Sequence, residues 1–283
     1  MAFEPQFRIT PRMLRQLKAI EQTAGFLNAV RLRPEWLAEV RGRTQVTEAF
    51  ASLQIEGNSL TLEQAFELAQ NPPARELRNS ERELCNYLSA FQAIDSLRNE
   101  RRAVVGRGDL CNLHQVLLKD VRGGESSCGE FRKEDVKVGD VGAGEMVVHH
   151  QPPSWLQVDP EVESLLSWIE AGKERGEGPD DPWIHPVIQA GIAQHRFVWI
   201  HPFVDGNGRT ARMFTSLLLY QRGYDFKYLF ELSAYYNQNR DKYYRALRTA
   251  DTTGDYTDWL IYFLGGFACQ MVDIQVLARG GER

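Results

Sequence analysis

The stretch Val187–Ile200 constrains the fold of this chain more than any other part of the sequence. It reads VIQAGIAQHRFVWI, and apolar residues occupy almost every side of the helix that its length predicts. A helix with almost no polar face cannot lie on a protein surface, so it needs other elements around it. The sequence therefore predicts a buried central helix and a surrounding shell that the rest of the chain must supply.

Helical spacing of apolar residues recurs through the remainder of the chain. One series is formed by Leu14, Leu17, Ile20 and Leu27, and another by Leu84, Leu88, Phe91, Ile94 and Leu97. Further helices are predicted over Asp109–Lys119, Val162–Gly172, Arg209–Arg222, Asn239–Thr249 and Tyr256–Ala278. The protein is therefore expected to be mainly α-helical.

Helix boundaries are marked most clearly in the first third of the chain. Gly57 is typical of a helix end, and Thr61 followed by Gln64 predicts a capping box that opens the next helix. The sequence 71–73, Asn-Pro-Pro, then breaks the chain, and a long helix is predicted to begin near Ala74.

The segment 123–153 differs from its surroundings because it is rich in glycine and contains short β-type pieces. Asp135–Val138 and Met146–His150 predict the two strands of a hairpin. Long irregular segments inside compact domains are usually functional. A second charged, Gly/Pro-rich stretch, Gly172–Pro182, is expected to be a surface loop.

Composition excludes several classes of protein. Among the 283 residues, 43% are hydrophobic and 25% charged, as in ordinary globular proteins, and the net charge of −5 lacks the basic field of nonspecific nucleic-acid binding. We therefore expect no nucleic-acid partner. Apolar stretches such as Trp259–Ala268 are interpreted as too short or too interrupted to span a bilayer, and the N-terminus has no signal-peptide core, so no membrane association is expected.

The cysteines Cys85, Cys111, Cys128 and Cys269 are scattered, with no CxxC pair. This pattern favours reduced thiols over disulfides or a zinc site. A cytoplasmic location is the expectation.

The segment 201–212, HPFVDGNGRTAR, concentrates polar groups between two predicted apolar helices. Gly206 and Gly208 flank a single asparagine just before the second helix, where consecutive backbone N–H groups can point at one anion. Arg209 and Arg212 are one helical turn apart, so both guanidiniums can reach the same polyanion.

Two further side chains in this segment add chemistry. Asp205 is a hard oxygen ligand of the kind that suits Mg²⁺ bridging phosphates, and His201 is the only nearby group that titrates around neutral pH. A base, a metal ligand, a phosphate cradle and two cationic clamps are the parts of a phosphoryl or nucleotidyl transfer site.

The same segment resembles the signature of the Fic family, HxFx[D/E]GNGRxxR, and every specified position matches. The resemblance implies the Fic fold, a helical bundle around this loop and helix with a short β-hairpin flap. It implies a protein adenylyltransferase that moves AMP from ATP, with Mg²⁺, onto a hydroxyl of a target protein and releases pyrophosphate. The target is unknown and could be the protein itself.

Roles for individual residues follow from this resemblance alone. His201 would be the catalytic base, Asp205 would hold Mg²⁺ against the α- and β-phosphates, and Phe203 would pack into the core and fix the loop. The nucleotide would be bound by Gly206, Asn207, Gly208, Arg209, Thr210, Ala211 and Arg212. In that set Arg209 would contact the β-phosphate and Arg212 the γ-phosphate.

The resemblance also gives the hairpin and a downstream segment their roles. The flap would dock the target by β-augmentation through Met146, Val147, Val148 and His149. Metal binding by His149 and His150 is disfavoured, because two further ligands at suitable spacing are missing. Leu232–Tyr244 resembles the segment that walls the adenine and ribose pocket, although Tyr243 and Tyr244 suit the core equally well.

A shorter motif, Ser52–Gly57, matches the inhibitory pattern [S/T]xxxE[G/N] of the family. Its inhibitory residues would be Ser52, Glu56 and Gly57. Glu56 would lie in the last turn of a helix, where the helix dipole disfavours an anion, and this indicates a cationic partner elsewhere. The resemblance supplies that partner in Arg212, and it is to the class with an N-terminal inhibitory helix.

Two parts of the chain are therefore predicted. Residues 1–105 would form an N-terminal helical region with the inhibitory motif, and residues 106–283 the catalytic core with its flap near 123–153. Many relatives continue into a winged-helix domain, which we do not expect in this chain.

Other functions use the same residues. The reverse reaction, de-AMPylation, would use Glu56 to position water, and the sequence does not separate it from AMP transfer. A nucleotide-sensing module with little turnover is a further alternative, although an intact His201 argues against it. Kinase-like transfer, the target residue and a homo-oligomer are left open.

Overall fold

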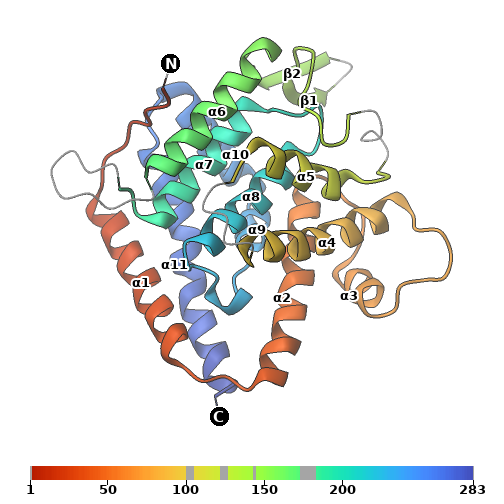
Figure 1. Ribbon diagram of the computed structural model, residues 1–283, viewed down its shortest axis with the longest axis vertical. Coiled ribbons are helices and arrows are strands. Elements are labelled where there is room, and N and C mark those ends of the chain that lie inside the picture. Colours follow the sequence, from red (N-terminus) through yellow and green to blue (C-terminus); the bar gives the residue numbers. More distant parts are fainter. Residues whose placement is uncertain (1, 100–104, 122–126, 143–144, 173–182, 283) are drawn as a thin grey trace.

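The computed structural model describes residues 2–99, 105–121, 127–142, 145–172 and 183–282. Eleven α-helices, one 3₁₀ turn and one antiparallel hairpin make up the described part of the chain, so the prediction of a mainly α protein is confirmed. Figure 1 shows the helices grouped around a central pair, with the hairpin at one end of the molecule.

The central pair consists of α7 (Pro186–Ile200) and α8 (Asn207–Gln221), joined by the loop 201–206. Eleven of the fifteen residues of α7 are buried, as its apolar sequence predicts. The polar residues among them have partners: Gln189 donates to the carbonyl of Ile169 at 3.0 Å. Helix α6 (Trp155–Ala171) covers one side of α7, and α11 (Thr257–Gly280) covers another.

The opposite side of α8 is covered by helices from the first half of the chain. Helix α4 (Asn79–Asn99) packs against α8, against α5 (Arg107–Leu118) and against α2 (Pro34–Ile55). Between α2 and α4 lies α3 (Leu62–Gln70), where the predicted capping box of Thr61 and Gln64 is present. The last turn of α2 is thereby held close to the start of α8.

The first and the last helix of the chain lie side by side. Helix α1 (Pro11–Ala29) packs along α11, and Leu32 forms an isolated bridge with Glu282. Between α8 and α11 the chain forms η1 (Phe226–Tyr228), α9 (Leu232–Gln238) and α10 (Arg240–Thr253).

Helix α11 agrees with the helix predicted over Tyr256–Ala278 to within two residues at each end. By length and composition it could cross a membrane, a test that the core helix of a soluble protein also passes. Just under half of its most apolar window is buried (44%), and it packs against α1, α7, α9 and α10.

Several predicted boundaries are wrong, among them the start of α6, which is Trp155 rather than Val162, and the end of α10, which is Thr253 rather than Thr249. The first strand, β1, is Val138–Gly142 rather than 135–138, and it pairs with β2 (Glu145–His150) through an irregularity at its first residue. The backbone of Gly139 comes so close to Val147 that a Cβ would lie 2.1 Å from its carbonyl oxygen, which places the glycine inside the ladder rather than after it. Helix α4 begins at Asn79, because residues 74–78 stay irregular and the Glu81 carboxylate accepts from the N–H of Arg78 at the helix start.

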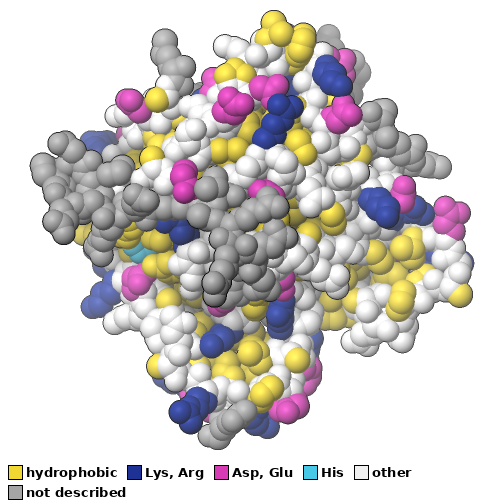
Figure 2. Space-filling view, in the orientation of Figure 1, with side chains coloured by type: hydrophobic (Ala, Val, Ile, Leu, Met, Phe, Trp, Pro, Cys, Tyr) yellow, Lys and Arg dark blue, Asp and Glu magenta, His cyan; other side chains and the backbone are white. Residues whose placement is uncertain are grey.

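Surface character is mixed on the face drawn in Figure 2, where basic and acidic side chains are interspersed. Hydrophobic side chains are exposed at the end of the molecule that carries the hairpin and the start of α6. Of the loop predicted over 172–182, residues 173–182 lie outside the described residues.

Candidate active site

His201 lies at the C-terminal end of α7 in a left-handed conformation (φ 52°, ψ 59°), which is costly for a residue with a Cβ. Its N–H donates to the carbonyl of Phe197 at 3.0 Å, and its ring Nδ1 lies 3.3 Å from the carbonyl of Val198. A carbonyl can only accept, so Nδ1 carries the proton and Nε2 keeps its lone pair. Burial lowers the pKa of His201 to about 4, so the ring is neutral at pH 7 and can accept a proton.

The loop after His201 is closed by its own residues. The side chain of Asn207 accepts from the N–H of Phe203 at 2.9 Å and donates to the carbonyl of Phe203 at 2.8 Å. Both polar side-chain atoms of Asn207 are therefore used in shaping the loop, and its backbone N–H is the group left to face a ligand. Phe203 is fully buried, as predicted, with its ring stacked on His114 at 3.7 Å.

His114 is a second buried histidine at this loop, and it comes from α5. Its Nδ1 accepts from the N–H of Gly129 at 2.9 Å, so Nε2 donates to the carbonyl of Asp205 at 3.0 Å. Burial lowers the pKa of His114 to about 4, which keeps the ring neutral. The neutral ring of His114 thus holds the loop 201–206 through its hydrogen bond to Asp205 and its stacking on Phe203.

The start of α8 presents backbone N–H groups at the predicted anion site. Gly206 is left-handed (φ 74°), and a Cβ there would lie 2.7 Å from Leu118, so only glycine fits. A Cβ on Gly208 would lie 2.3 Å from Oε1 of Glu56, which means that this carboxylate rests directly on the helix start. The side chains of Thr210 and Ala211 are fully buried, and the hydroxyl of Thr210 donates to the carbonyl of Gly206 at 2.9 Å.

Arg212 is brought together with Ser52 and Glu56, two of the three residues assigned to the inhibitory motif. Its Nη2 donates to Oε1 of Glu56 at 2.7 Å and to the carbonyl of Ser52 at 3.0 Å, and its Nε donates to Oγ of Ser52 at 2.7 Å. The Arg212 side chain is 1% exposed and Glu56 is 32% exposed. Glu56 caps α2 one residue after Ile55, and Gly57 follows with φ 87°.

Arg209 is buried at the same helix start and bonds two carboxylates. Its guanidinium donates to Glu83 on α4 at 3.0 Å and to Asp205 at 3.1 Å. Its Nε is buried without a hydrogen-bond partner. Glu83 was not anticipated from the sequence, because it lies 126 residues away from Arg209.

Asp205 is the residue predicted to bind Mg²⁺. Its side chain is 54% exposed, and besides the contact with Arg209 it accepts from the N–H of Gly206 at 2.6 Å. No group of three or more metal-ligating side chains occurs among the described residues. A single exposed carboxylate fits an ion held mainly by phosphate oxygens, since such ions take one or two protein carboxylates, and it does not fit a stand-alone metal centre.

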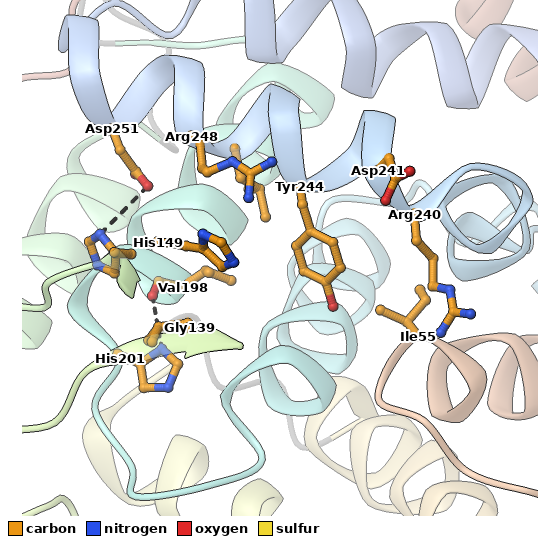
Figure 3. A pocket seen from close by; sticks show the side chains of 13 residues that line it. Ile55, Gly139, His149, Val198, His201, Arg240, Asp241, Tyr244, Arg248 and Asp251 are labelled. Atoms are coloured by element: carbon orange, nitrogen blue, oxygen red, sulfur yellow. Dashed lines mark hydrogen bonds and ion pairs between the residues drawn. The ribbon is translucent and has the colours of Figure 1, made fainter. Parts of the chain in front are cut away.

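A cavity of about 550 Å³ opens beside His201. Figure 3 shows Tyr244, Arg248 and Asp251 reaching into it from α10, with His149 from the hairpin and Ile55 from α2. Tyr244 is 38% exposed, whereas Tyr243 is buried in the core. The cavity is thus enclosed by the three elements to which the sequence assigns the flap, the nucleotide pocket and inhibition.

The predicted docking residues occupy the second strand of the hairpin. Met146, Val147 and Val148 are 46%, 56% and 44% exposed, and His149 lines the cavity. His150 instead turns toward the body of the protein, where its Nε2 lies 2.8 Å from the carbonyl of Trp199 and its Nδ1 lies 3.6 Å from Asp251.

Comparison with known proteins agrees with this geometry. Residues 105–219 match the model of the Fic/DOC family. The chain is 26% identical over 239 residues to proteins named protein adenylyltransferase Fic from Drosophila willistoni and Drosophila virilis, which covers 84% of this chain. It spans only 43% and 44% of the length of these relatives.

Solved structures show the same fold over nearly the whole chain. A Fic family protein from Desulfovibrio desulfuricans superposes with a TM-score of 0.79 and 26% identity, covering 97% of this chain and 77% of that one. A Fic domain containing signaling protein from Bacteroides thetaiotaomicron gives 0.75 with 19% identity, covering 94% and 98%. Fic-1 of C. elegans gives 0.72 with 19% identity, covering 95% and 73%. Residues 105–219 are therefore similar to the Fic/DOC family, and nearly the whole chain has the fold of the solved Fic-family structures.

Proposed function

We propose that this protein transfers AMP from ATP to a hydroxyl side chain of a protein, either a separate target or itself, and releases pyrophosphate. The observation that carries the proposal is a neutral histidine, His201, which lines a cavity and lies in the turn before the start of α8, where two arginines, Arg209 and Arg212, are buried. The relatives named protein adenylyltransferase support the same activity. The scattered free cysteines are compatible with a cytoplasmic location, which we propose as well.

The nucleotide would bind between the cavity and the start of α8. A volume of about 550 Å³ lies within the usual range of small-molecule sites, and Tyr244 and Arg248 offer a ring and a cation to a nucleoside. The triphosphate would meet the N–H groups of 206–208 and the guanidiniums of Arg209 and Arg212. A bound Mg²⁺ would supply charge neutralisation at the phosphates, with Asp205 as its protein ligand.

His201 would act on the attacking hydroxyl. Its Nε2 takes the hydroxyl proton as the oxygen forms a bond to the α-phosphorus, and the bond from that phosphorus to the bridging oxygen breaks. The electron pair leaves with pyrophosphate. The exposed strand β2 would hold the target segment by adding a strand to the hairpin, with the side chains of Met146, Val147 and Val148 available for contact.

Glu56 would restrain this reaction in the resting protein. Its carboxylate rests on Gly208 and pairs with Arg212, so it occupies the anion site that the terminal phosphate needs. We propose that the triphosphate can bind in full only when this pair opens.

De-AMPylation is the second candidate, and one observation favours it. The carboxylate of Glu56 is one-third exposed at the reaction site, so it could orient a water molecule there. An assay with a pre-labelled protein in place of ATP would separate the two directions.

The decisive experiment is incubation with α-labelled or γ-labelled ATP and Mg²⁺, using the wild type and a Glu56→Gly variant. Protein-bound label from α-labelled ATP only is expected for AMP transfer. Label from γ-labelled ATP would show phosphorylation instead, and no label from either would favour a nucleotide-sensing module.

Two variants of the Glu56→Gly protein test the assigned roles. His201→Ala is expected to reduce labelling by roughly 10²–10⁴-fold while calorimetry shows that ATP still binds. Asp205→Ala is expected to remove both the labelling and its dependence on Mg²⁺. Full labelling by the first variant, or an unchanged Mg²⁺ titration by the second, would contradict the respective role.

A further inference from the structure

The C-terminal end of α7 is capped by residues that belong to the base of the hairpin. The last carbonyls of a helix have no partners within it, and here they meet two side chains from outside. The carbonyl of Trp199 lies 2.8 Å from Nε2 of His150, and Nε of Arg132 donates to the carbonyl of His201 at 2.8 Å. A further nitrogen of the same guanidinium donates to the carbonyl of Ile200 at 3.4 Å.

The same guanidinium also holds both ends of the hairpin. Nη1 of Arg132 donates to the carbonyl of Glu134, before β1, at 2.9 Å, and Nη2 donates to the carbonyl of Pro153, after β2, at 2.5 Å. The backbone N–H of Arg132 donates to the carbonyl of Pro202 at 2.9 Å. One side chain therefore joins the two legs of the hairpin to the turn that carries His201.

Arg132 is placed there at an electrostatic cost. Its side chain is fully buried, and Asp135, at 3.9 Å and 62% exposed, is the nearest carboxylate among the ion pairs of the described residues. Burial lowers the pKa of Arg132. The compensating partial charge comes from carbonyl oxygens, two at the negative end of α7 and one on each leg of the hairpin. Only a guanidinium has enough donors in a fixed fork to reach all four.

The strained backbone of His201 explains why the hydrogen bonds of Arg132 matter for the site. A left-handed residue with a Cβ persists only where its surroundings fix it, and the carbonyl of this residue is bonded by Arg132. We propose that Arg132 is a positioning residue, which holds the His201 ring and the target-binding strand β2 in one fixed geometry. This inference rests on the proposed function, because it states that one side chain sets the distance between the catalytic base and the hydroxyl of the target.

The test uses Arg132→Lys in the Glu56→Gly protein. Lysine keeps the positive charge, but one ammonium group cannot reach the carbonyls of both hairpin legs and of His201. We expect kcat for self-labelling to fall by about 10- to 100-fold, because a misplacement of 1 Å can cost about 10²-fold, while KM for ATP stays within about twofold. The His201 pKa, followed by NMR, should rise from about 4 toward its ordinary value of 6.5 as the turn opens to water.

Arg222→Lys is the matched control. Arg222 is a partly buried arginine whose pKa burial also lowers, and it bonds the carbonyl of Ile169 near the end of α6, away from the hairpin. This control should lower the melting temperature without changing kcat or the His201 titration. Because the charge is kept in both variants, a change in the His201 pKa reports on its surroundings and not on a lost cation.

Each result decides one question. Unchanged kcat and an unchanged His201 titration in Arg132→Lys would overturn the positioning role, and so would a loss of kcat that the Arg222→Lys control shows to the same extent. If the parent protein takes no label from α-labelled ATP, the proposed function fails instead, and the His201 titration still decides whether Arg132 holds the turn.

Discussion

His201 and His114 give the site a pH dependence unlike that of an exposed histidine. Burial lowers the pKa of each to about 4. Labelling by the Glu56→Gly protein should therefore stay nearly constant from pH 8 down to about 5.5, where an ordinary histidine with a pKa near 6.5 would already be mostly protonated. A pH–rate profile with a half-maximal point near 6.5 would show that His201 is not held as the structure shows.

The pH dependence of the free energy of unfolding should also reflect the lowered pKa values of His201 and His114. Between pH 6.5 and 4 the unfolded chain binds protons that the folded protein does not, so the free energy of unfolding falls as the pH falls through this window. A shift from 6.5 to about 4 corresponds to at most roughly 3 kcal/mol for each histidine, at about 1.4 kcal/mol per unit. Urea titrations at pH 7 and pH 4.5 should show a smaller loss for His114→Asn than for the wild type.

Among single residues, the sequence predicts the site residues that lie within one short motif and misses those that come from distant parts of the chain. His201 and Arg212 were identified because they lie within twelve residues of each other. Arg132, His114 and Glu83 join them only after folding, and nothing in their local sequence distinguishes a buried positioning residue from a surface one. Asn207 was found, but its use in closing the loop depends on backbone geometry that a motif does not contain.

Among the elements, α2 is the one that the proposed restraint acts through. Glu56→Gly removes the carboxylate from the start of α8 and leaves Arg212 bonded to Ser52. We expect self-labelling to rise at least about tenfold and ATP affinity to increase, because one competitor for the anion site is gone. Glu63→Gly, on the exposed first turn of α3, is the control and should leave both unchanged.

If Glu56→Gly labels itself no faster than the wild type and binds ATP no more tightly, the end of α2 has no inhibitory role. The gain should also disappear when His201→Ala is added, because it acts through the same site.

A second contact of α2, made by Glu48, predicts that the protein becomes less stable at alkaline pH. Glu48 is buried and accepts from the N–H of Ser233, at 2.8 Å, and from its hydroxyl, so it caps the start of α9. Burial raises the pKa of Glu48 to about 8, so the folded protein holds a proton that the unfolded chain has lost above pH 4.5. Stability should therefore fall by roughly 2–4 kcal/mol between pH 5 and pH 9, and Glu48→Gln should flatten that decline.

Thermal unfolding of both proteins across this pH range measures the effect. An equal decline in wild type and variant would show that Glu48 is ionised in the folded state at neutral pH.

Element types were predictable where spacing is regular, and element boundaries were not. The central helix α7 and the capping box of α3 follow from local patterns. The start of α4 and the register of β1 depend on Glu81 and on the close approach of Gly139 to Val147, which are tertiary contacts. Strand β2 was predicted to within one residue, as Met146–His150, and the side chains of 146–149 on it are exposed.

For the whole molecule, the predicted division at residues 105 and 106 stays a prediction, and the packing suggests a test of it. The core segment 106–283 contains α11, whose inner face is covered by Met13, Ile20 and Leu27 of α1, all at most 1% exposed. It also contains Arg212 and α9, which take partners from α2. Expressed alone, 106–283 should lack a cooperative thermal transition and bind a hydrophobic dye.

Adding residues 1–105 as a separate chain is the matched control and should restore the transition if the two parts dock. A cooperative transition for 106–283 alone would show that the core is an independent domain.

The carboxylate of Glu56, which rests on the start of α8, competes with the terminal phosphate of ATP and is part of the same polypeptide chain. Its local concentration does not fall on dilution, so the fraction of molecules in the open state depends only on the strength of the Arg212–Glu56 pair. If opening costs about 3 kcal/mol, the lower limit for a buried pair since Glu56 is one-third exposed, roughly one molecule in a hundred is open at any moment. The wild-type protein then labels itself at a small, constant fraction of the rate of the Glu56→Gly variant. The ratio of the two labelling rates therefore measures the free energy of the Arg212–Glu56 ion pair.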